Sequence, residues 1–142
     1  MNKNSHELEI ILLGTYCNIV LEILKNNKNL SVLKVMAFSY LTKKNKYMHS
    51  NVYNYSNKND VVLKSLSMFS GLFDDYIDNT KYIIGAIHLL IKNKKIVEHE
   101  GELIYIETNE LFIQEKTFIN LAIMESKKYS DEQFLKELVR NV

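Results

Sequence analysis

The stretch YIIGAIHLLIKNKKIVEHEGELIYIE, residues 82–107, joins a helical pattern directly to a hairpin pattern. Apolar residues recur at helical spacing in its first half, which predicts a helix over residues 81–93. The second half, residues 94–107, places Glu100 and Gly101 between two short extended runs, which predicts a β-hairpin with Ile104 packed inward. A helix that leads straight into a hairpin is typical of a winged helix, in which the helix packs on the core and the hairpin is the wing.

Three further helices are predicted upstream, over residues 5–27, 32–42 and 60–77. Ser5, Ser31 and Asp60 are the expected N-caps, because their short side chains accept hydrogen bonds from the first free backbone N–H groups. Residues 78–80, Asp-Asn-Thr, are expected to end the third of these helices. Apolar residues surround the second helix on nearly all sides, so we expect it to be central.

Two acidic helices are predicted after the hairpin, within residues 110–142. The first covers residues 111–127, and the second follows a capping box formed by Ser130 and Gln133. No repeat or internal linker is visible in the 142 residues, a length that suits one domain. The sequence therefore predicts a single domain over residues 1–142, mainly α with a small β-hairpin, winged-helix-like and with C-terminal helices.

The composition argues against several classes of protein. With 46% hydrophobic and 25% charged residues, the chain is expected to be globular rather than disordered. No apolar run approaches the ~20 residues of a membrane span, so no membrane contact is expected. The single cysteine, Cys17, rules out an internal disulfide and is in keeping with a cytoplasmic protein. With four glycines, one arginine and no proline, neither a glycine-rich phosphate loop nor an arginine-based reader of DNA bases is expected.

The charge is unevenly distributed, although the net charge is only +1. Residues 23–59 contain seven lysines and no acid, whereas residues 98–142 contain ten acids and five bases. Residues 43–59 predict a long loop rich in lysine and tyrosine, whose lysines can neutralise phosphates and whose tyrosines can stack on bases. The candidate nucleic-acid contacts are Lys43, Lys44, Lys46, Tyr47, Tyr53, Tyr55 and Lys58. The alternative is a solvated loop, in a sequence whose composition is typical of AT-rich codons.

Three acids, Glu98, Glu100 and Glu102, are expected at the tip of the hairpin. A DNA-binding wing usually presents basic residues, because DNA phosphates repel carboxylates. We therefore interpret these acids as residues that bind a partner protein.

No catalytic, metal or cofactor site is predicted. The four histidines lack the spacing of metal ligands, and His88 is expected to be buried in the core. Cys17 has no predicted base or orienting partner and is expected to be a small buried side chain. Asp74, Asp75 and Asp78 are expected to form a solvated C-terminal turn of the third helix rather than a magnesium site. We therefore expect that the chain is not an enzyme.

Three pieces of the sequence carry a family resemblance. They are the pair LEIILLGTYCNIVLEILKN and LSVLKVMAFSYLTKKN (residues 8–26 and 30–45), the helix–hairpin stretch quoted above, and the short acidic helical tail. Together they resemble the small middle-component subunits of bacterial three-component ABC ATPase systems, the group that includes Lamassu anti-phage defence. The resemblance implies a non-catalytic accessory or scaffold subunit of an antiviral complex. Such a subunit bridges or regulates two partners: an SMC-like ATPase that senses DNA, and a separate effector that is often a nuclease. The resemblance also implies that the subunit contacts DNA only through the complex and that it has no cofactor and no small-molecule substrate.

Two other functions stay open. A winged-helix transcriptional regulator would bind duplex DNA as a homodimer, but the helix predicted over residues 60–77 carries only Lys64 as a basic residue. A phage protein that binds a host factor would have much the same composition.

Overall fold

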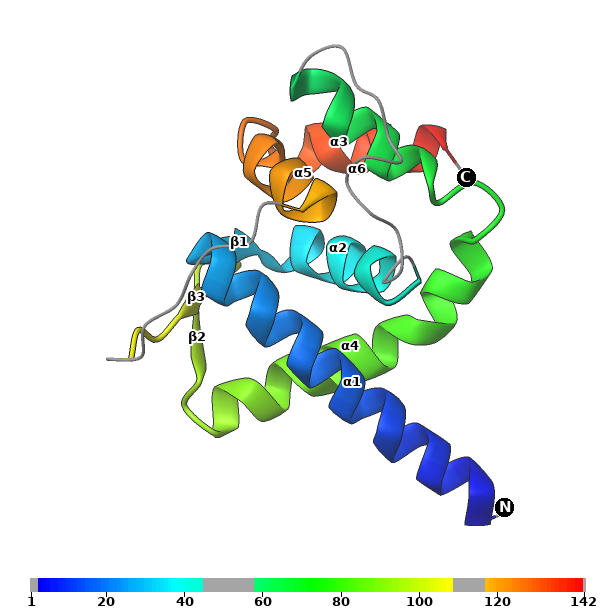
Figure 1. Ribbon diagram of the computed structural model, residues 1–142, viewed down its shortest axis with the longest axis vertical. Helices are drawn as coiled ribbons and strands as arrows, with labels where there is room; N and C mark the ends of the chain where they lie inside the picture. The colour runs from blue at the N-terminus through cyan, green and yellow to red at the C-terminus, as the bar shows by residue number, and fades with distance from the viewer. Residues whose placement is uncertain (1–2, 45–57, 109–116, 142) are drawn as a thin grey trace.

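Six helices and three strands make up the parts of the chain that the computed structural model describes, residues 3–44, 58–108 and 117–141 (Figure 1). In chain order they are α1 (Lys3–Asn27), β1 (Asn29–Ser31), α2 (Val32–Lys44), α3 (Lys58–Ser67), α4 (Phe73–Lys92), β2 (Ile96–His99), β3 (Glu102–Tyr105), α5 (Phe118–Ser126) and α6 (Asp131–Arg140). The described chain is therefore mainly helical with a small antiparallel sheet, as predicted.

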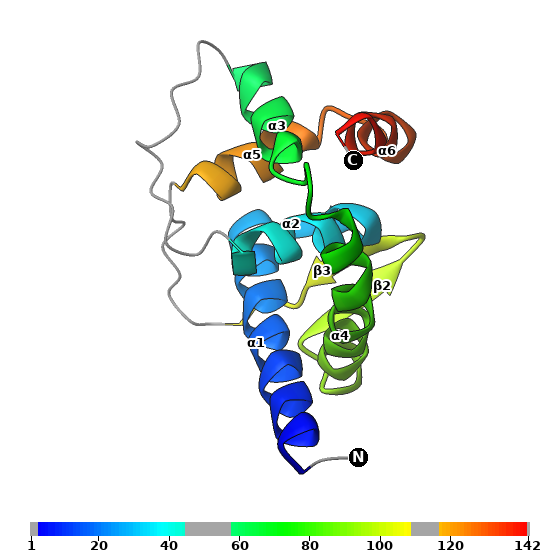
Figure 2. The same ribbon diagram turned by 90° about the vertical axis from the view of Figure 1, so that its right-hand side faces the viewer.

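Helix α2 lies at the centre of the molecule. α1 and α4 cross each other on one side of it, and α3, α5 and α6 lie on the other side (Figures 1 and 2). Phe38 and Tyr40 of α2 are among the largest side chains that have no exposure to solvent. The Phe38 ring packs against Phe134 of α6, with 5.6 Å between the ring centroids. The prediction of a central second helix is confirmed.

The sheet has the strand order β1–β3–β2, and both strand pairs are antiparallel. Leu30 of β1 is paired with Leu103 of β3, and these two side chains and Ile96 of β2 are buried in the core. The turn between β2 and β3 consists of Glu100 and Gly101, whose φ angles of 50° and 80° suit a type I′ turn. The predicted hairpin is confirmed.

Two features of the sheet differ from the prediction. After α1, Lys28 adopts a left-handed conformation (φ 68°), which turns the chain into the unexpected strand β1. The Lys28 carbonyl oxygen accepts a hydrogen bond from the N–H of Tyr105 at 2.8 Å, so β1 depends on β3 beside it. In β3, Leu103 is fully buried and Ile104 only partly, because successive side chains of a strand point to opposite faces. The expected inward position of Ile104 is wrong.

The boundary between the third and fourth helices lies near Gly71, not at residues 78–80. α3 ends at Ser67, and Gly71, with a φ of 77°, turns the chain toward α4. α4 then runs through Asp78, Asn79 and Thr80 without a break. The Asn79 amide and the Thr80 hydroxyl donate to carbonyl oxygens of the preceding turn at 2.8 and 2.7 Å, so they do not compete with the helix.

Asp74 and Asp75 therefore lie in the first turn of α4. The expected C-terminal turn of a preceding helix is wrong. Carboxylates at this end are favourable, because the helix dipole is positive there.

The predicted N-caps divide into two groups. Ser31 accepts a hydrogen bond from the N–H of Lys34 at 3.4 Å, and Ser130 forms the predicted capping box with Gln133. These two caps are confirmed. Ser5 and Asp60 are not caps, because α1 already begins at Lys3 and α3 at Lys58. The predicted start of the helix near residue 111 lies outside the described residues, and α5 follows an N-cap at Thr117.

Candidate partner-binding surfaces

The acidic residues of the hairpin do not all face solvent. Glu98 and Glu100 are exposed. Glu102 begins β3 partly buried, with one carboxylate oxygen shielded from solvent, and its charge acts on Lys34 and Lys127. Of the three acids predicted to bind a partner, Glu98 and Glu100 are therefore accessible to a partner, whereas Glu102 is turned toward the body of the protein.

Helix α4, which leads into the hairpin, presents a mixed acidic and apolar outer face. Ile77 and Ile84, two turns apart, are 49% and 42% exposed. Asp74, Asp78 and Lys81 are exposed on the same side, since residues three and four apart are neighbours on a helix. α4 and the hairpin together, residues 73–107, contain seven carboxylates and four lysines, so the unit is net negative.

The basic loop lies mostly outside the described residues. The predicted contacts Lys46, Tyr47, Tyr53 and Tyr55 lie outside the described residues. Lys58 is the first residue of α3, but its side chain is not described. Lys43 and Lys44 form the last turn of α2. Lys44 Nζ lies 2.8 Å from Asp75 Oδ2 of α4 and 5.9 Å from the centre of the Tyr40 ring, so its charge is held against the protein.

Lys44 belongs to a polar cluster that joins α1, α2 and α4. The Tyr40 hydroxyl donates to Asp75 Oδ2 at 2.7 Å, and the Tyr16 hydroxyl donates to Asn79 Oδ1 at 2.9 Å. The hydrogen bonds from Lys44 and then Tyr40 hold the pKa of Asp75 below its ordinary value. Burial raises the pKa of both tyrosines. The cluster therefore fixes α4 in place rather than offering a free carboxylate.

A buried lysine, which was not among the predicted site residues, holds the C-terminal helices. Lys34 of α2 is 5% exposed, and its Nζ donates to the carbonyl oxygens of Ser126 and Tyr129 at 2.8 and 2.6 Å, where α5 ends. Nearby, Ser31 Oγ donates to Asp131 Oδ1 at the start of α6 at 2.7 Å. Burial lowers the pKa of Lys34, and the charge of Asp131 opposes this shift. The signal in the sequence is a lysine that is the single polar residue among the apolar residues 32–38.

The histidine and cysteine side chains form no site in the part of the chain that is described. His88 is exposed, because Ile87 and Leu90 take the buried face of α4; its expected place in the core is wrong. Cys17 is partly buried, with Sγ 3.9 Å from the carbonyl oxygen of Ala86, and burial raises the pKa of its thiol. Across residues 3–44, 58–108 and 117–141, no three potential metal ligands come together.

Two further apolar surfaces are exposed, and neither belongs to the predicted sites. The first, called here the α1 arm, consists of Leu8, Ile10 and Ile11 near the start of α1. The second, called here the α6 pair, consists of Leu135 and Val139. Sequence periodicity cannot distinguish such residues from core residues, because both are apolar and spaced as on a helix.

Comparison with known proteins identified no relative: no family model, no curated protein and no solved structure matches the chain. Among the helices described, none has the length and apolar content needed to cross a membrane.

Proposed function

We propose that this protein is a non-catalytic accessory subunit that binds other proteins through the outer face of α4 and the hairpin. The observation that carries the proposal is the character of this face. Exposed Ile77 lies beside Asp74 and Asp78, exposed Ile84 lies two turns further along the helix, and the unit from α4 to the hairpin contains seven carboxylates and four lysines. Such a face repels DNA phosphates and attracts a partner that presents apolar and basic side chains.

The order of elements supports a winged-helix-like fold. A helix, a short strand and a second helix are followed, after α3, by a helix and a hairpin, and the strands pair in the order β1–β3–β2. Winged helices include both DNA-binding domains and protein-interaction modules, so the surface and not the fold indicates the function. In this chain α4 is the helix that precedes the hairpin, and the carboxylates on its outer face favour a protein partner over DNA.

The class of partner follows from the resemblance to middle-component subunits of three-component ABC ATPase systems of the Lamassu type. In this proposal the chain bridges or regulates an SMC-like ATPase and a separate effector nuclease in cytoplasmic antiviral defence. The ATPase engages DNA, and the chain itself acts without a cofactor. Its task is to hold two proteins together, for which the exposed faces of a small helical domain are sufficient.

Co-purification of the tagged chain with the products of its neighbouring genes tests this function. We expect mass spectrometry to identify a stoichiometric SMC-like ATPase. The double substitution Ile77→Glu and Ile84→Glu should abolish its recovery, because it places charges in the apolar part of the interface. Met124→Glu on α5 is the matched control, since Met124 is also exposed (45%) but lies on another element. Recovery of the chain alone, or equal recovery by all variants, would contradict the proposal.

A regulator that binds duplex DNA is the second candidate, and the seven lysines of residues 23–59 favour it. It predicts a homodimer whose affinity for duplex DNA falls steeply as the salt concentration rises. Replacing Lys43 and Lys46 by glutamate should then weaken binding, measured by fluorescence anisotropy of labelled DNA. An affinity that these substitutions leave unchanged would dismiss this candidate.

A further inference from the structure

The exposed residues of α4 are arranged symmetrically about the middle of the helix. Ile77 and Ile84 are 49% and 42% exposed, and the first half of α4 runs along the margin of the molecule (Figure 1). Residues seven apart lie almost directly above each other on a helix, so the two isoleucines form one apolar row. Asp74, Lys81 and His88, which are exposed and also seven apart, form a polar row beside it.

The charges on this face are segregated along the helix. The carboxylates of α4 all lie within residues 74–78, and its basic side chains all lie within residues 81–92. Asp74, Asp78 and Lys81 take part in none of the ion pairs that the described residues form with one another. These three charges can therefore pair with charges of a partner.

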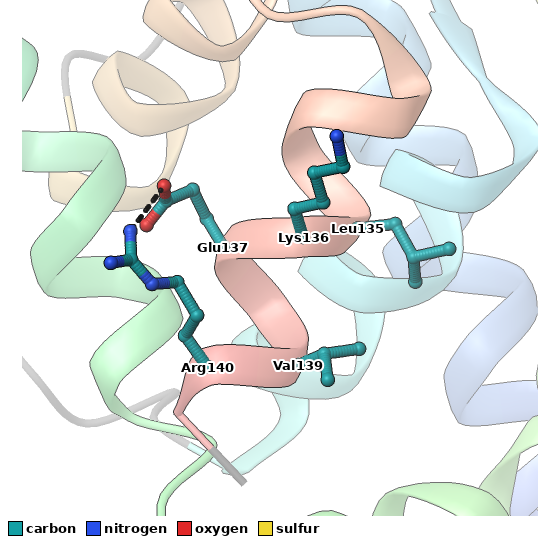
Figure 3. Close-up of a pocket in the computed structure, with 5 residues that line it drawn as sticks. All are labelled: Leu135, Lys136, Glu137, Val139 and Arg140. Atoms are coloured by element: carbon teal, nitrogen blue, oxygen red, sulfur yellow. Dashed lines mark hydrogen bonds and ion pairs between the residues drawn. The ribbon is translucent and has the colours of Figure 1, made fainter.

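The α6 pair lacks this arrangement. Leu135 and Val139, which are 45% and 55% exposed, point to the same side of α6 (Figure 3). The charges beside them neutralise each other within the helix, since Arg140 Nη1 lies 3.1 Å from Glu137 Oε1 (Figure 3). The charges of α6 therefore favour no partner of either sign.

We infer that two copies of this chain associate through the outer faces of α4, with the two helices antiparallel about a two-fold axis. The axis passes between residues 80 and 81, midway between Ile77 and Ile84. Ile77 of each copy then packs on Ile84 of the other, so the contact is made twice and covers both apolar residues. A two-fold dimer requires a surface that is complementary to itself, and the outer face of α4 meets this requirement.

The antiparallel arrangement also brings opposite charges together. A rise of about 1.5 Å per residue places Asp74 about 10 Å before the axis and His88 about 11 Å after it, so Asp74 of one copy lies level with His88 of the other. Asp78 lies about 4 Å before the axis and Lys81 about 1 Å after it, a difference that the long lysine side chain can span. A parallel pair of helices would instead place each charge beside its own counterpart.

The dimer covers the face that the proposed function assigns to a partner protein, so it implies a form of regulation. This consequence rests on the proposed function: the partner must displace the second copy before it can bind Ile77 and Ile84. The free chain then keeps its exposed apolar row covered until the partner is present.

Sedimentation velocity of the full chain over a range of micromolar concentrations tests the inference. We expect reversible dimerisation of the unaltered protein. Asp78→Lys should weaken dimerisation by about tenfold or more, because it brings like charges together across the axis. Asp78→Lys combined with Lys81→Asp should restore dimerisation, because the exchanged charges again meet in opposite pairs. Glu132→Lys is the matched control, since it reverses an exposed carboxylate on α6, on the other side of α2 (Figures 1 and 2). Circular dichroism of each variant establishes that the fold is retained.

Restored dimerisation in the doubly substituted chain supports the inference. An unaltered chain that is monomeric at every concentration would overturn it, as would a dimer that Asp78→Lys does not weaken or that the double substitution does not restore. Co-purification keeps this result separate from the proposed function. A chain that is monomeric alone but recovers the SMC-like ATPase overturns the inference and leaves the proposed function standing, whereas a dimer that passes both tests but recovers no ATPase supports the inference and contradicts the proposed function.

Discussion

Replacing Lys34 by methionine removes one ammonium group from the interior and keeps most of the apolar stem. Lys34 Nζ donates to the carbonyl oxygens of Ser126 and Tyr129 at 2.8 and 2.6 Å and lies 6.0 Å from the centre of the Phe134 ring. These carbonyl groups lie at the end of α5, where the negative end of the helix dipole favours a cation. The substitution therefore leaves two acceptors without a charged donor in a largely buried site.

The expected cost follows from these contacts. A hydrogen bond to a charged group contributes about 1.5–3 kcal/mol, and Lys34 Nζ makes two such bonds to backbone carbonyl oxygens. Desolvation of the ammonium, which lowers the pKa of Lys34, offsets part of this stabilisation. We expect Lys34→Met to lower the free energy of unfolding by about 3 kcal/mol. That is a large share of the ~5–15 kcal/mol typical of a native protein.

Urea unfolding followed by circular dichroism measures this change. The midpoint should fall while the slope m stays the same, because the surface exposed on unfolding is unaltered. Lys136→Met is the matched control: its side chain is 73% exposed and paired with Glu132, so its removal should cost less than about 1 kcal/mol. If Lys34→Met also costs less than about 1 kcal/mol with an unchanged m, the reasoning about Lys34 is refuted.

Three other predictions concern the hairpin, a buried tyrosine and the start of α6. Leu103→Asp should lower the free energy of unfolding by several kcal/mol because it buries an unpaired carboxylate, and Ile104→Asp should lower it clearly less. Urea unfolding of both variants measures the two losses, and a larger loss for Ile104→Asp would contradict the observed packing of β3. Burial raises the pKa of Tyr76 from 10.0 to about 12. Between these two pH values the tyrosine ionises in the unfolded chain but stays neutral in the folded protein, so the stability that it contributes is complete below pH 10 and is lost as the pH rises to 12. The loss is about 1.4 kcal/mol per pKa unit. Tyr76→Phe should make the urea midpoint less sensitive to pH over this interval, and an equal pH dependence in both proteins would exclude this role. Ser130→Ala removes the capping box and should cost about 1 kcal/mol in the same assay, whereas an unchanged midpoint would show that the cap adds nothing.

The features that the sequence predicts correctly depend on residues that are close in the chain. Ser130 and Gln133 satisfy each other's backbone within one turn, and Glu100 with Gly101 forms the hairpin turn without help from other elements. Their residue types alone reveal such structures. The exposure of Glu100 follows for the same reason, since Glu100 is part of the turn itself.

The features that the sequence does not predict depend on distant residues. Asn79 is typical of turns, yet it stays in α4, where it accepts a hydrogen bond from Tyr16, 63 positions earlier. Lys34 finds its acceptor at Ser126, 92 positions later. The inward turn of Glu102 likewise depends on lysines of other elements. Local propensity says nothing about such contacts, because tertiary packing decides them.

The fold also changes the meaning of the basic front half of the sequence. Among the lysines that the structure describes, several already have partners within the protein: Lys28 lies 3.5 Å from Glu107, Lys44 lies 2.8 Å from Asp75, and Lys34 is buried. Lys34 and Lys44 must give up these contacts before they can bind a phosphate, so they add less to DNA affinity than their number suggests, whereas the exposed Lys28–Glu107 pair costs little to break. Part of the charge separation seen in the sequence therefore serves to hold its own segments together. The same ion pairs also neutralise Asp75 and Glu107, two of the seven carboxylates of α4 and the hairpin, so they reduce the charge on both sides. The choice between the two candidate functions therefore rests on the exposed Ile77 and Ile84, which fit the apolar core of a protein interface better than contact with DNA phosphates.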